Sequence, residues 1–254
     1  MSAAFNLDEY INHHIRDSHQ WQLPFLPTIQ LPPYLSLHGV MLLIGTLVLI
    51  IIFCFLYDKK QPVPHGFTNL LEFFVVYMRD EIAIKNLGEE EGRRMTPFLC
   101  TLFFFILVLN LLGLIPLFTA ATANLNVTGA LAFLTLCFMI FGTLWKNGFK
   151  GFLKAITPSG IPWLILPVPF LMEFFGIFTK AFALMIRLFA NMLAGHIMIF
   201  SLLGIVVTLG LIGLPALVLG VCIAAFEVFV AFLQAYIFVM LSAVFIGRMY
   251  HPDH

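Results

Sequence analysis

Two apolar stretches near the carboxyl end of the chain are longer than a membrane is thick. Residues 165–207 and 214–248 contain 43 and 35 residues. As helices rising about 1.5 Å per residue they would measure roughly 64 and 52 Å, against a hydrocarbon core of about 30 Å. Neither stretch contains an internal turn signal, whereas "GLIGLP" at 210–215 separates them. We therefore predict a hairpin of two long helices that lie steeply tilted in a membrane.

Three shorter apolar blocks precede this hairpin, at 38–57, 98–118 and 128–145, and each is long enough for one membrane crossing. The whole chain is 61% hydrophobic and 10% charged, whereas a soluble domain carries about 25% charged residues. The sequence therefore predicts an all-α membrane protein with about five membrane helices. We expect a polar N-terminal arm over 1–37 and a single membrane domain over 38–254.

The basic residues predict the orientation of these helices. With the N-terminus outside, the inner segments hold Lys59, Lys60, Arg79, Lys85, Arg93, Arg94, Lys146, Lys150, Lys154 and Arg248. Arg16 alone lies outside. Because loops on the inner side of a membrane carry the excess of Lys and Arg, we predict that the N-terminus lies outside and the C-terminus inside.

Residues 66–92, between the first two blocks, have an amphipathic pattern. Apolar residues recur at helical spacing, with charged residues elsewhere on the wheel. This pattern predicts a helix lying on the inner membrane surface. A soluble partner docking on the same face is an equally open interpretation.

Several functional classes lack their sequence signals. The net charge is zero, so we expect no nucleic-acid partner. The four cysteines each lie alone in an apolar run, with no Cys/His ligand spacing, so we expect no metal site, disulfide or cofactor. His13, His14 and His19 have no partner cluster and are expected in a solvated arm. The N-terminus has no apolar core of a cleavable signal peptide.

The two long blocks nevertheless contain polar residues in a regular arrangement. Glu173, Lys180 and Arg187 are spaced by seven, which places them on one stripe of a helix. Asn191 lies on the same side as Arg187, because four residues amount to about one turn. His196, nine residues beyond Arg187, lies about 180° round the helix.

Folding the hairpin at its centre, near residue 211.5, pairs the polar residues of the two helices. His196 and Glu227 are each 15.5 residues from that centre. Arg187 is 24.5 residues before it and Gln234 is 22.5 residues after it. We therefore predict two polar layers, in which His196 lies level with Glu227 and Arg187 lies level with Gln234.

Ionisable residues near a bilayer centre cost about 2.5–3.5 kcal/mol each on insertion scales, and they usually mark an ion or proton path. His196 and a membrane-buried Glu227 can exchange protons near neutral pH. Arg187 stays charged and would force a nearby carboxylate to ionise. Ion pairs that hold the two helices together are the structural alternative.

Particular segments resemble a known family. "RLFANMLAGH", preceded by "MEFFGIFTKAFALMI" and followed by "EVFVAFLQAYIFVMLSAVFI", resembles the signature region of subunit a of the F-type ATP synthase. The upstream "NLLGLIP" and "TANLNVTGALA" are similar to that family's second and third membrane segments. The resemblance spans roughly residues 95 to 250 and extends loosely to the N-terminus.

The resemblance implies roles for six residues, matched position by position. Arg187 corresponds to the family's essential arginine, which faces a carboxylate of the rotating c-ring. Asn191 and Gln234 correspond to the asparagine one turn beyond that arginine and the glutamine opposite it. His196 and Glu227 correspond to a pair lining the outer half-channel; in some bacterial members the glutamate comes first, and the order here is the one seen in mitochondrial members. Glu173 corresponds to an acidic position lining the inner half-channel, and Lys180 lies on the same stripe.

The family also implies a mechanism and partners. Protons would enter past His196 and Glu227, ride the c-ring for nearly a full rotation, and leave past Glu173. The two tilted helices would lie against the c-ring, and a b-type peripheral-stalk subunit would complete the stator. The chain would couple proton flow to ATP synthesis without a catalytic site of its own, in a bacterial inner membrane.

Two other function classes are weighed against this one. A self-contained transporter or channel would bind its substrate on the polar stripe, but the sequence has neither the internal repeats nor the mid-membrane helix breaks of such folds. An intramembrane enzyme would need a nucleophile–base or metal spacing, which is absent. The sequence leaves open the choice between protons and sodium, and between a bacterial and an organellar origin.

Overall fold

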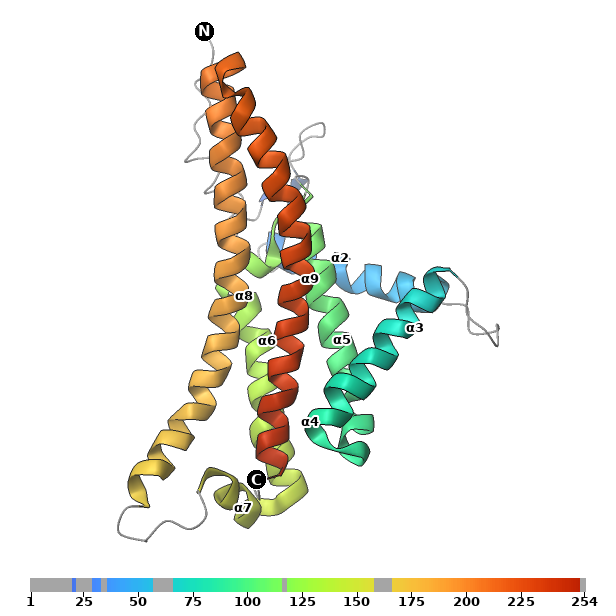
Figure 1. The fold of residues 1–254 in the computed structure, drawn as a ribbon, viewed down its shortest axis with the longest axis vertical. Helices are drawn as coiled ribbons and strands as arrows, with labels where there is room; N and C mark the ends of the chain where they lie inside the picture. Colours follow the sequence, from blue (N-terminus) through green and yellow to red (C-terminus); the bar gives the residue numbers. More distant parts are fainter. Residues whose placement is uncertain are drawn as a thin grey trace. The chain divides into compact units, whose positions relative to one another are not determined.

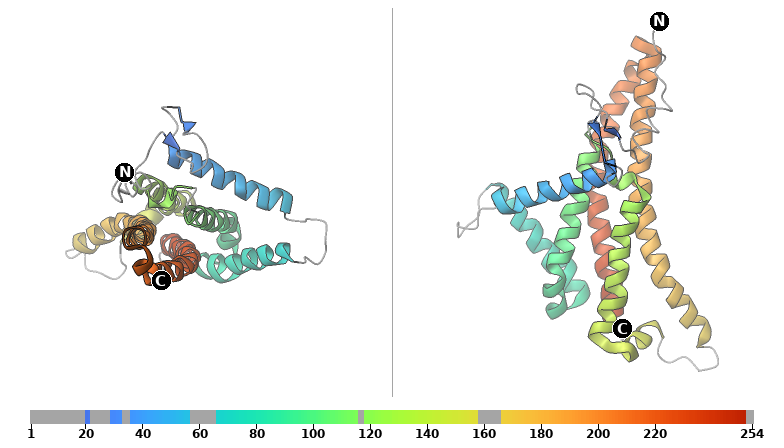
Figure 2. Two further views of the ribbon diagram at one scale, coloured as in Figure 1. Left: turned by 90° about the horizontal axis from the view of Figure 1, so that it is seen from above. Right: turned by 180° about the vertical axis from the view of Figure 1, so that it is seen from behind.

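The computed structural model describes residues 20–21, 29–32, 36–56, 66–115, 118–157 and 166–251. Most of the predicted N-terminal arm therefore lies outside the described residues, as do Arg16, Lys59, Lys60 and the histidines at 13, 14 and 19. Two short strands, β1 (Gln20–Trp21) and β2 (Ile29–Gln30), pair antiparallel. Figure 2 draws this pair near the beginning of α2.

Helices make up nearly all of the remaining described chain. In order they are α2 (Leu37–Ile51), η1 (Ile52–Leu56), α3 (Phe67–Tyr77), η2 (Met78–Ile84), α4 (Lys85–Leu87), α5 (Glu89–Gly113), η3 (Ala121–Ala123), α6 (Leu125–Cys137), η4 (Phe138–Gly142), α7 (Thr143–Ile156), α8 (Pro167–Leu209), η5 (Gly210–Gly213) and α9 (Leu214–Tyr250) (Figure 1).

Among the described residues, four helical stretches are long and apolar enough to cross a membrane: Leu37–Phe55, Glu89–Gly113, Leu125–Ile156 and Pro167–Tyr250. The last of these comprises both α8 and α9, so the all-α membrane fold is confirmed. Large apolar side chains on this last stretch remain uncovered within the chain; Met172 is 71% exposed and Val221 is 64% exposed. Lipid or another apolar subunit must cover surfaces of this kind.

The hairpin of two long helices is confirmed. α8 has 43 residues and α9 has 37, and the four-residue turn η5 joins them. Helix α8 ends at Leu209 and α9 begins at Leu214, so the predicted centre at 211.5 lies in the middle of the turn. The steep tilt of the hairpin in a membrane stays a prediction.

The second membrane helix begins nine residues before the predicted start at 98. In α5 the acidic residues of the first turn pair with basic residues four positions on: Arg93 Nη2 lies 3.1 Å from Glu89 Oε1, and Arg94 Nη2 lies 2.8 Å from Glu90 Oε1. Carboxylates in the first turn also suit the helix dipole. Hydropathy detects the apolar part of a helix and misses such a charged first turn. The same helix ends at Gly113, five residues before the predicted 118.

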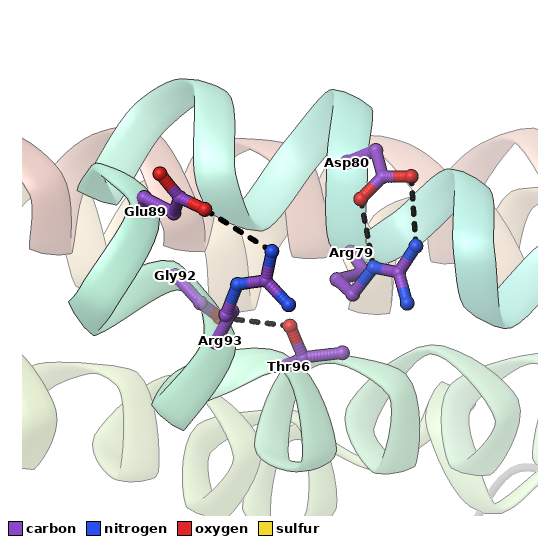
Figure 3. Close-up of polar contacts among 6 residues, drawn as sticks. All are labelled: Arg79, Asp80, Glu89, Gly92, Arg93 and Thr96. Carbon is purple, nitrogen blue, oxygen red and sulfur yellow. Dashed lines mark hydrogen bonds and ion pairs between the residues drawn. The ribbon is translucent and has the colours of Figure 1, made fainter.

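The predicted surface helix over 66–92 is broken before its end. The helical run α3–η2–α4 stops at Leu87, and Gly88, at a φ of 84°, separates it from α5. Within η2, Arg79 Nε donates to Asp80 Oδ1 over 2.7 Å, and this hydrogen bond lowers the pKa of the Asp80 carboxyl. Figure 3 shows this pair beside the Arg93–Glu89 pair and the hydrogen bond from Thr96 to the Gly92 carbonyl.

The third block also differs from its prediction. The helix continues beyond the predicted end at 145, because α7 runs to Ile156 and includes "WKNGFKGFLK". Gly148 has φ 67° and ψ −179° and kinks α7. A positive φ of this size suits glycine, which lacks a Cβ. A segment with this many lysines has a low mean hydropathy although it forms an amphipathic helix.

The chain divides into two compact units. The described residues of the first fall within 1–50, 105–128 and 187–235, and those of the second fall within 51–104, 129–186 and 236–254. The core of the first unit includes a cluster of Leu37, Met41, Leu109 and Ala121, and a smaller cluster of Ala120, Ala123 and Met192. The single membrane domain proposed for 38–254 stays a prediction.

The second unit is fastened by polar contacts at the carboxyl end of α9. Asn147 Nδ2 donates to the Tyr250 carbonyl over 3.0 Å, and His251 Nε2 donates to the Leu87 carbonyl over 2.8 Å. A buried hydrogen bond of 3.2 Å joins the hydroxyls of Thr135 and Ser242. Figure 1 accordingly draws the carboxyl end of α9 close to α7.

Candidate functional site

The first unit brings together His196 of α8 and Glu227 of α9. His196 Nδ1 lies 3.5 Å from Glu227 Oε1, and the two side chains are 10% and 7% exposed. The predicted level pairing of these two residues is confirmed. The pair joins the two helices through two ionisable side chains that are both buried.

Glycine at position 195 makes this contact possible. A Cβ built on Gly195 would overlap the carboxylate of Glu227. Any side chain here would therefore displace the carboxylate from His196, because the clash is with the functional group itself. In the sequence Gly195 looks like any other glycine of a membrane helix. That it leaves room for the Glu227 carboxylate becomes visible only when α9 packs against α8.

The imidazole of His196 has a carbonyl oxygen at each ring nitrogen. Nδ1 lies 2.8 Å from the Met192 carbonyl and Nε2 lies 2.9 Å from the Gly113 carbonyl. A neutral ring donates from one nitrogen and a charged ring from both. Because carbonyls only accept, these two oxygens can bond both nitrogens of the charged ring but only one nitrogen of the neutral ring.

The carboxylate of Glu227 has fewer partners. Both of its oxygens are buried, and neither accepts a hydrogen bond from the described part of the chain. A buried carboxylate in that position requires a proton, a charged neighbour or water. His196, at 3.5 Å, is the neighbour that can supply the charge.

A buried polar network that we did not predict lies beside this pair. Asn110 of α5 and Thr122 of η3 are both fully buried. Thr122 Oγ1 donates to Asn110 Oδ1 over 2.8 Å, and Asn110 Nδ2 donates to the carbonyl of Ala231 over 3.3 Å. Ala231 lies one turn beyond Glu227, so the network fixes α9 near the carboxylate. An asparagine inside an apolar block was the available sequence signal.

The remaining predicted residues of the first unit do not form a closed site. Arg187 is exposed, Asn191 is half-buried, and Gln234 is 5% exposed with a buried Nε2 that has no partner among the described residues. No described residue forms a hydrogen bond or ion pair with Arg187, so its pairing with Gln234 stays a prediction. The exposure of Arg187 and the burial of His196 agree with their predicted places on opposite sides of α8.

Glu173 and Lys180, in the second unit, form an ion pair. Lys180 Nζ donates to Glu173 Oε1 over 2.6 Å, between positions seven apart on α8. This pair lies within one helix, so it does not join α8 to α9 as the structural alternative requires. Glu173 also lines a cavity of about 950 Å³ in the second unit.

Among the described residues, no three His, Cys, Asp or Glu side chains lie together as a metal site requires. The four cysteines are free. The expectation of a chain without metal or cofactor stays a prediction.

Four long apolar stretches, with a buried His–Glu pair between the last two helices, define a polytopic helical membrane protein that carries titratable groups within its membrane segments. The sequence matches the family of the ATP synthase A chain over residues 39–247. The chain belongs to that family, and it is an integral membrane protein.

Curated relatives support this assignment. The chain is 49% identical to ATP synthase subunit a of Myxococcus xanthus, over 78% of this chain and 67% of the relative. It is 42% identical to ATP synthase subunit a of Chloroherpeton thalassium, over 95% of this chain and 77% of the relative. The subunit from Anaeromyxobacter dehalogenans strain 2CP-C is 44% identical over 85% of this chain, which spans 58% of that relative's length.

Proposed function

We propose that this chain is the stator subunit a of an F-type ATP synthase, and that it forms two offset proton half-channels that couple transmembrane proton flow to rotation of a c-ring. The observation that carries this proposal is the buried contact of 3.5 Å between His196 and Glu227. The chain contributes no catalytic site of its own; ATP is made or hydrolysed elsewhere in the complex.

The outer half-channel runs past His196 and Glu227. A proton entering from outside binds one member of the pair and passes to the other, because an imidazole and a carboxyl group can each bind and release a proton. The carbonyls at both ring nitrogens of His196 support this role, since they accept hydrogen bonds from the charged ring. Gln234, buried seven residues beyond Glu227, lines the path toward the ring.

Arg187 faces the rotor. Its guanidinium is exposed and lacks an ion pair with any described residue, and an unpaired charge in a bilayer core costs about 2.5–3.5 kcal/mol on insertion scales. A carboxylate of a c-ring subunit supplies the missing anion. Arg187 keeps that carboxylate ionised as it passes and blocks a direct proton leak between the half-channels, and Asn191 lies one turn further along the same face.

The inner half-channel begins at Glu173. Lys180 holds this carboxylate at 2.6 Å, and the adjoining cavity of about 950 Å³ gives it an opening. A proton that leaves the rotor carboxylate after nearly a full rotation exits along this route. The assembly also contains a b-type peripheral-stalk subunit, and it lies in a bacterial inner membrane with the N-terminus of this chain outside and its C-terminus inside.

Replacing the arginine tests the proposal. We expect Arg187→Ala to abolish ATP-driven proton pumping by the complex reconstituted in vesicles, measured with a pH-sensitive dye. Arg93→Ala is the matched control, because Arg93 is an exposed cation in an i,i+4 pair with Glu89. Wild-type pumping by the Arg187 variant would contradict the proposal, and so would equal loss in both variants.

A further inference from the structure

A second cavity in the second unit lies where two membrane helices change from charged to apolar sequence. It has a volume of about 570 Å³, and its lining includes the charged residues Glu91, Arg94 and Lys146 beside the aromatic residues Phe138, Phe141 and Trp145. Helix α5 carries no charged residue after Arg94, and the run from α6 through η4 carries none before Lys146. Both stretches are long and apolar enough to cross a membrane, so the cavity lies at the level where hydrocarbon meets water. Tryptophan at such a level is typical of membrane interfaces.

Glu91 lies between two cations that do not donate a hydrogen bond to it. Arg94 Nη1 and Lys146 Nζ each lie 3.9 Å from Glu91 Oε1, whereas an N–H···O hydrogen bond spans about 2.7–3.2 Å. The side chains of Glu91 and Lys146 are 20% and 25% exposed, so a ligand in the cavity can reach both. These three groups attract one another through charge but keep donors and acceptors that a ligand can use.

The charges at this cavity balance. Arg94 Nη2 also donates to Glu90 Oε1 over 2.8 Å, so two cations, Arg94 and Lys146, stand against two carboxylates, Glu90 and Glu91. An anionic headgroup would add an uncompensated negative charge, whereas a zwitterionic headgroup adds no net charge. In a phosphoethanolamine group the phosphate would accept hydrogen bonds from Arg94 and Lys146, and the ammonium would donate to Glu91. A choline group has no N–H and could not donate to that carboxylate.

Tyr250 fixes Lys146 at the cavity. Lys146 Nζ lies 5.1 Å from the centre of the Tyr250 ring, a cation–π contact. Asn147 Nδ2 donates to the Tyr250 carbonyl over 3.0 Å, and a Cβ built on Gly142 would overlap the Tyr250 hydroxyl, so the ring is held against η4. The basic side of the cavity is therefore held in place before a ligand binds.

We infer that this cavity binds a phospholipid with a phosphoethanolamine headgroup, with its phosphate between Arg94 and Lys146 and its ammonium on Glu91. The acyl chains would leave the cavity along Phe141, which is 66% exposed. Contact with hydrocarbon at this point favours a lipid over free phosphoethanolamine. Neither the rotor nor the proton half-channels enter this inference, so its test is separate from that of the proposed function.

Lipid binding to the delipidated, detergent-purified complex tests the inference. Native mass spectrometry would measure the affinities for phosphatidylethanolamine, phosphatidylcholine and phosphatidylglycerol with the same acyl chains, with soluble phosphoethanolamine as a competitor. The test variant is Glu91→Gln, which removes the charge that holds the ammonium and keeps the shape of the side chain. Glu89→Gln is the matched control, because Glu89 is 76% exposed in a pair with Arg93 and does not line the cavity. Copurification of the other subunits checks that both variants assemble.

We expect the wild type to bind phosphatidylethanolamine roughly tenfold more tightly than the other two lipids, since a hydrogen bond to a charged group contributes about that factor. The Glu91 variant should lose this preference, and the control should bind like the wild type. Equal affinity of the wild type for the ethanolamine and choline lipids would overturn the inference without any substitution in the protein. Equal losses in the two variants would overturn it too, because general surface charge would then bind the lipid. So would displacement of the lipid by millimolar phosphoethanolamine, because the soluble compound would then be the ligand.

Discussion

The carboxylate of Glu227 lies against the backbone of Gly195, at a position that a Cβ would occupy, and the same carboxylate is 3.5 Å from the imidazole of His196. The absence of a side chain at 195 therefore determines where the acidic member of the pair lies. A residue that cannot itself bind a proton controls the distance between two that can.

Gly195→Ala should separate the pair. The added methyl would force the Glu227 side chain to move, and overpacking of this kind costs about 1–3 kcal/mol. We expect a lower midpoint of thermal unfolding and a strong loss of ATP-driven proton pumping in vesicles.

Gly176→Ala is the matched control for this substitution. Gly176 is also on α8, but a Cβ there would meet nothing within 4 Å. Normal pumping by the Gly195 variant would show that the close approach of Glu227 is unimportant. Equal loss in both variants would show that α8 tolerates no alanine.

Asn110→Ala should weaken the packing of α9 on α5. The substitution removes the acceptor of the Thr122 hydroxyl and the donor to the Ala231 carbonyl, and leaving buried polar groups unpaired costs about 1–3 kcal/mol. The thermal midpoint of the purified complex should fall. Asn126→Ala, at an exposed position, should leave it unchanged; an unchanged midpoint in the Asn110 variant would mean that the network does not stabilise the fold.

Glu173 and Lys180 should be energetically coupled. Lys180 Nζ lies 2.6 Å from Glu173 Oε1, and both side chains are only partly exposed. The pair should therefore show a coupling energy of about 0.5–3 kcal/mol in a double-mutant cycle. The cycle would use Glu173→Gln, Lys180→Met and the double variant, followed by thermal unfolding.

The exposed Glu89–Arg93 pair provides the comparison for that cycle. Its side chains are 76% and 61% exposed, so its coupling energy should not exceed about 0.5 kcal/mol. A coupling energy for Glu173 and Lys180 no larger than this would mean that Lys180 does not hold the carboxylate.

The two long helices and the level pairing of His196 with Glu227 could be predicted from the sequence. Apolar run length indicates a membrane helix directly, and the depth count paired His196 with Glu227 because η5 is centred on the predicted fold point. The pairing of Arg187 with Gln234 stays a prediction, because the depth count does not give the orientation of a long side chain, which depends on its surroundings. For Arg187 we propose that those surroundings include a partner outside the chain.

Other features depended on tertiary packing or on charge and could not be read from hydropathy. The role of Gly195 appears only when α9 lies against it, and the Asn110–Thr122 bond joins a helix to a 3₁₀ turn twelve residues away. The first turn of α5 and the whole of α7 carry lysines, arginines or glutamates. Hydropathy therefore placed the ends of the predicted membrane helices short of these charged segments.

Proton pumping by variants of the His196–Glu227 pair tests directly whether these two residues form a proton relay. The set comprises His196→Glu, Glu227→His and the exchange variant that carries both, each reconstituted in vesicles at matched protein content. If the two residues form a relay, each single variant places two like groups together and should lose most ATP-driven pumping. The exchange variant restores one imidazole and one carboxylate at the same depth and should recover part of it. Wild-type pumping by both single variants would contradict the account.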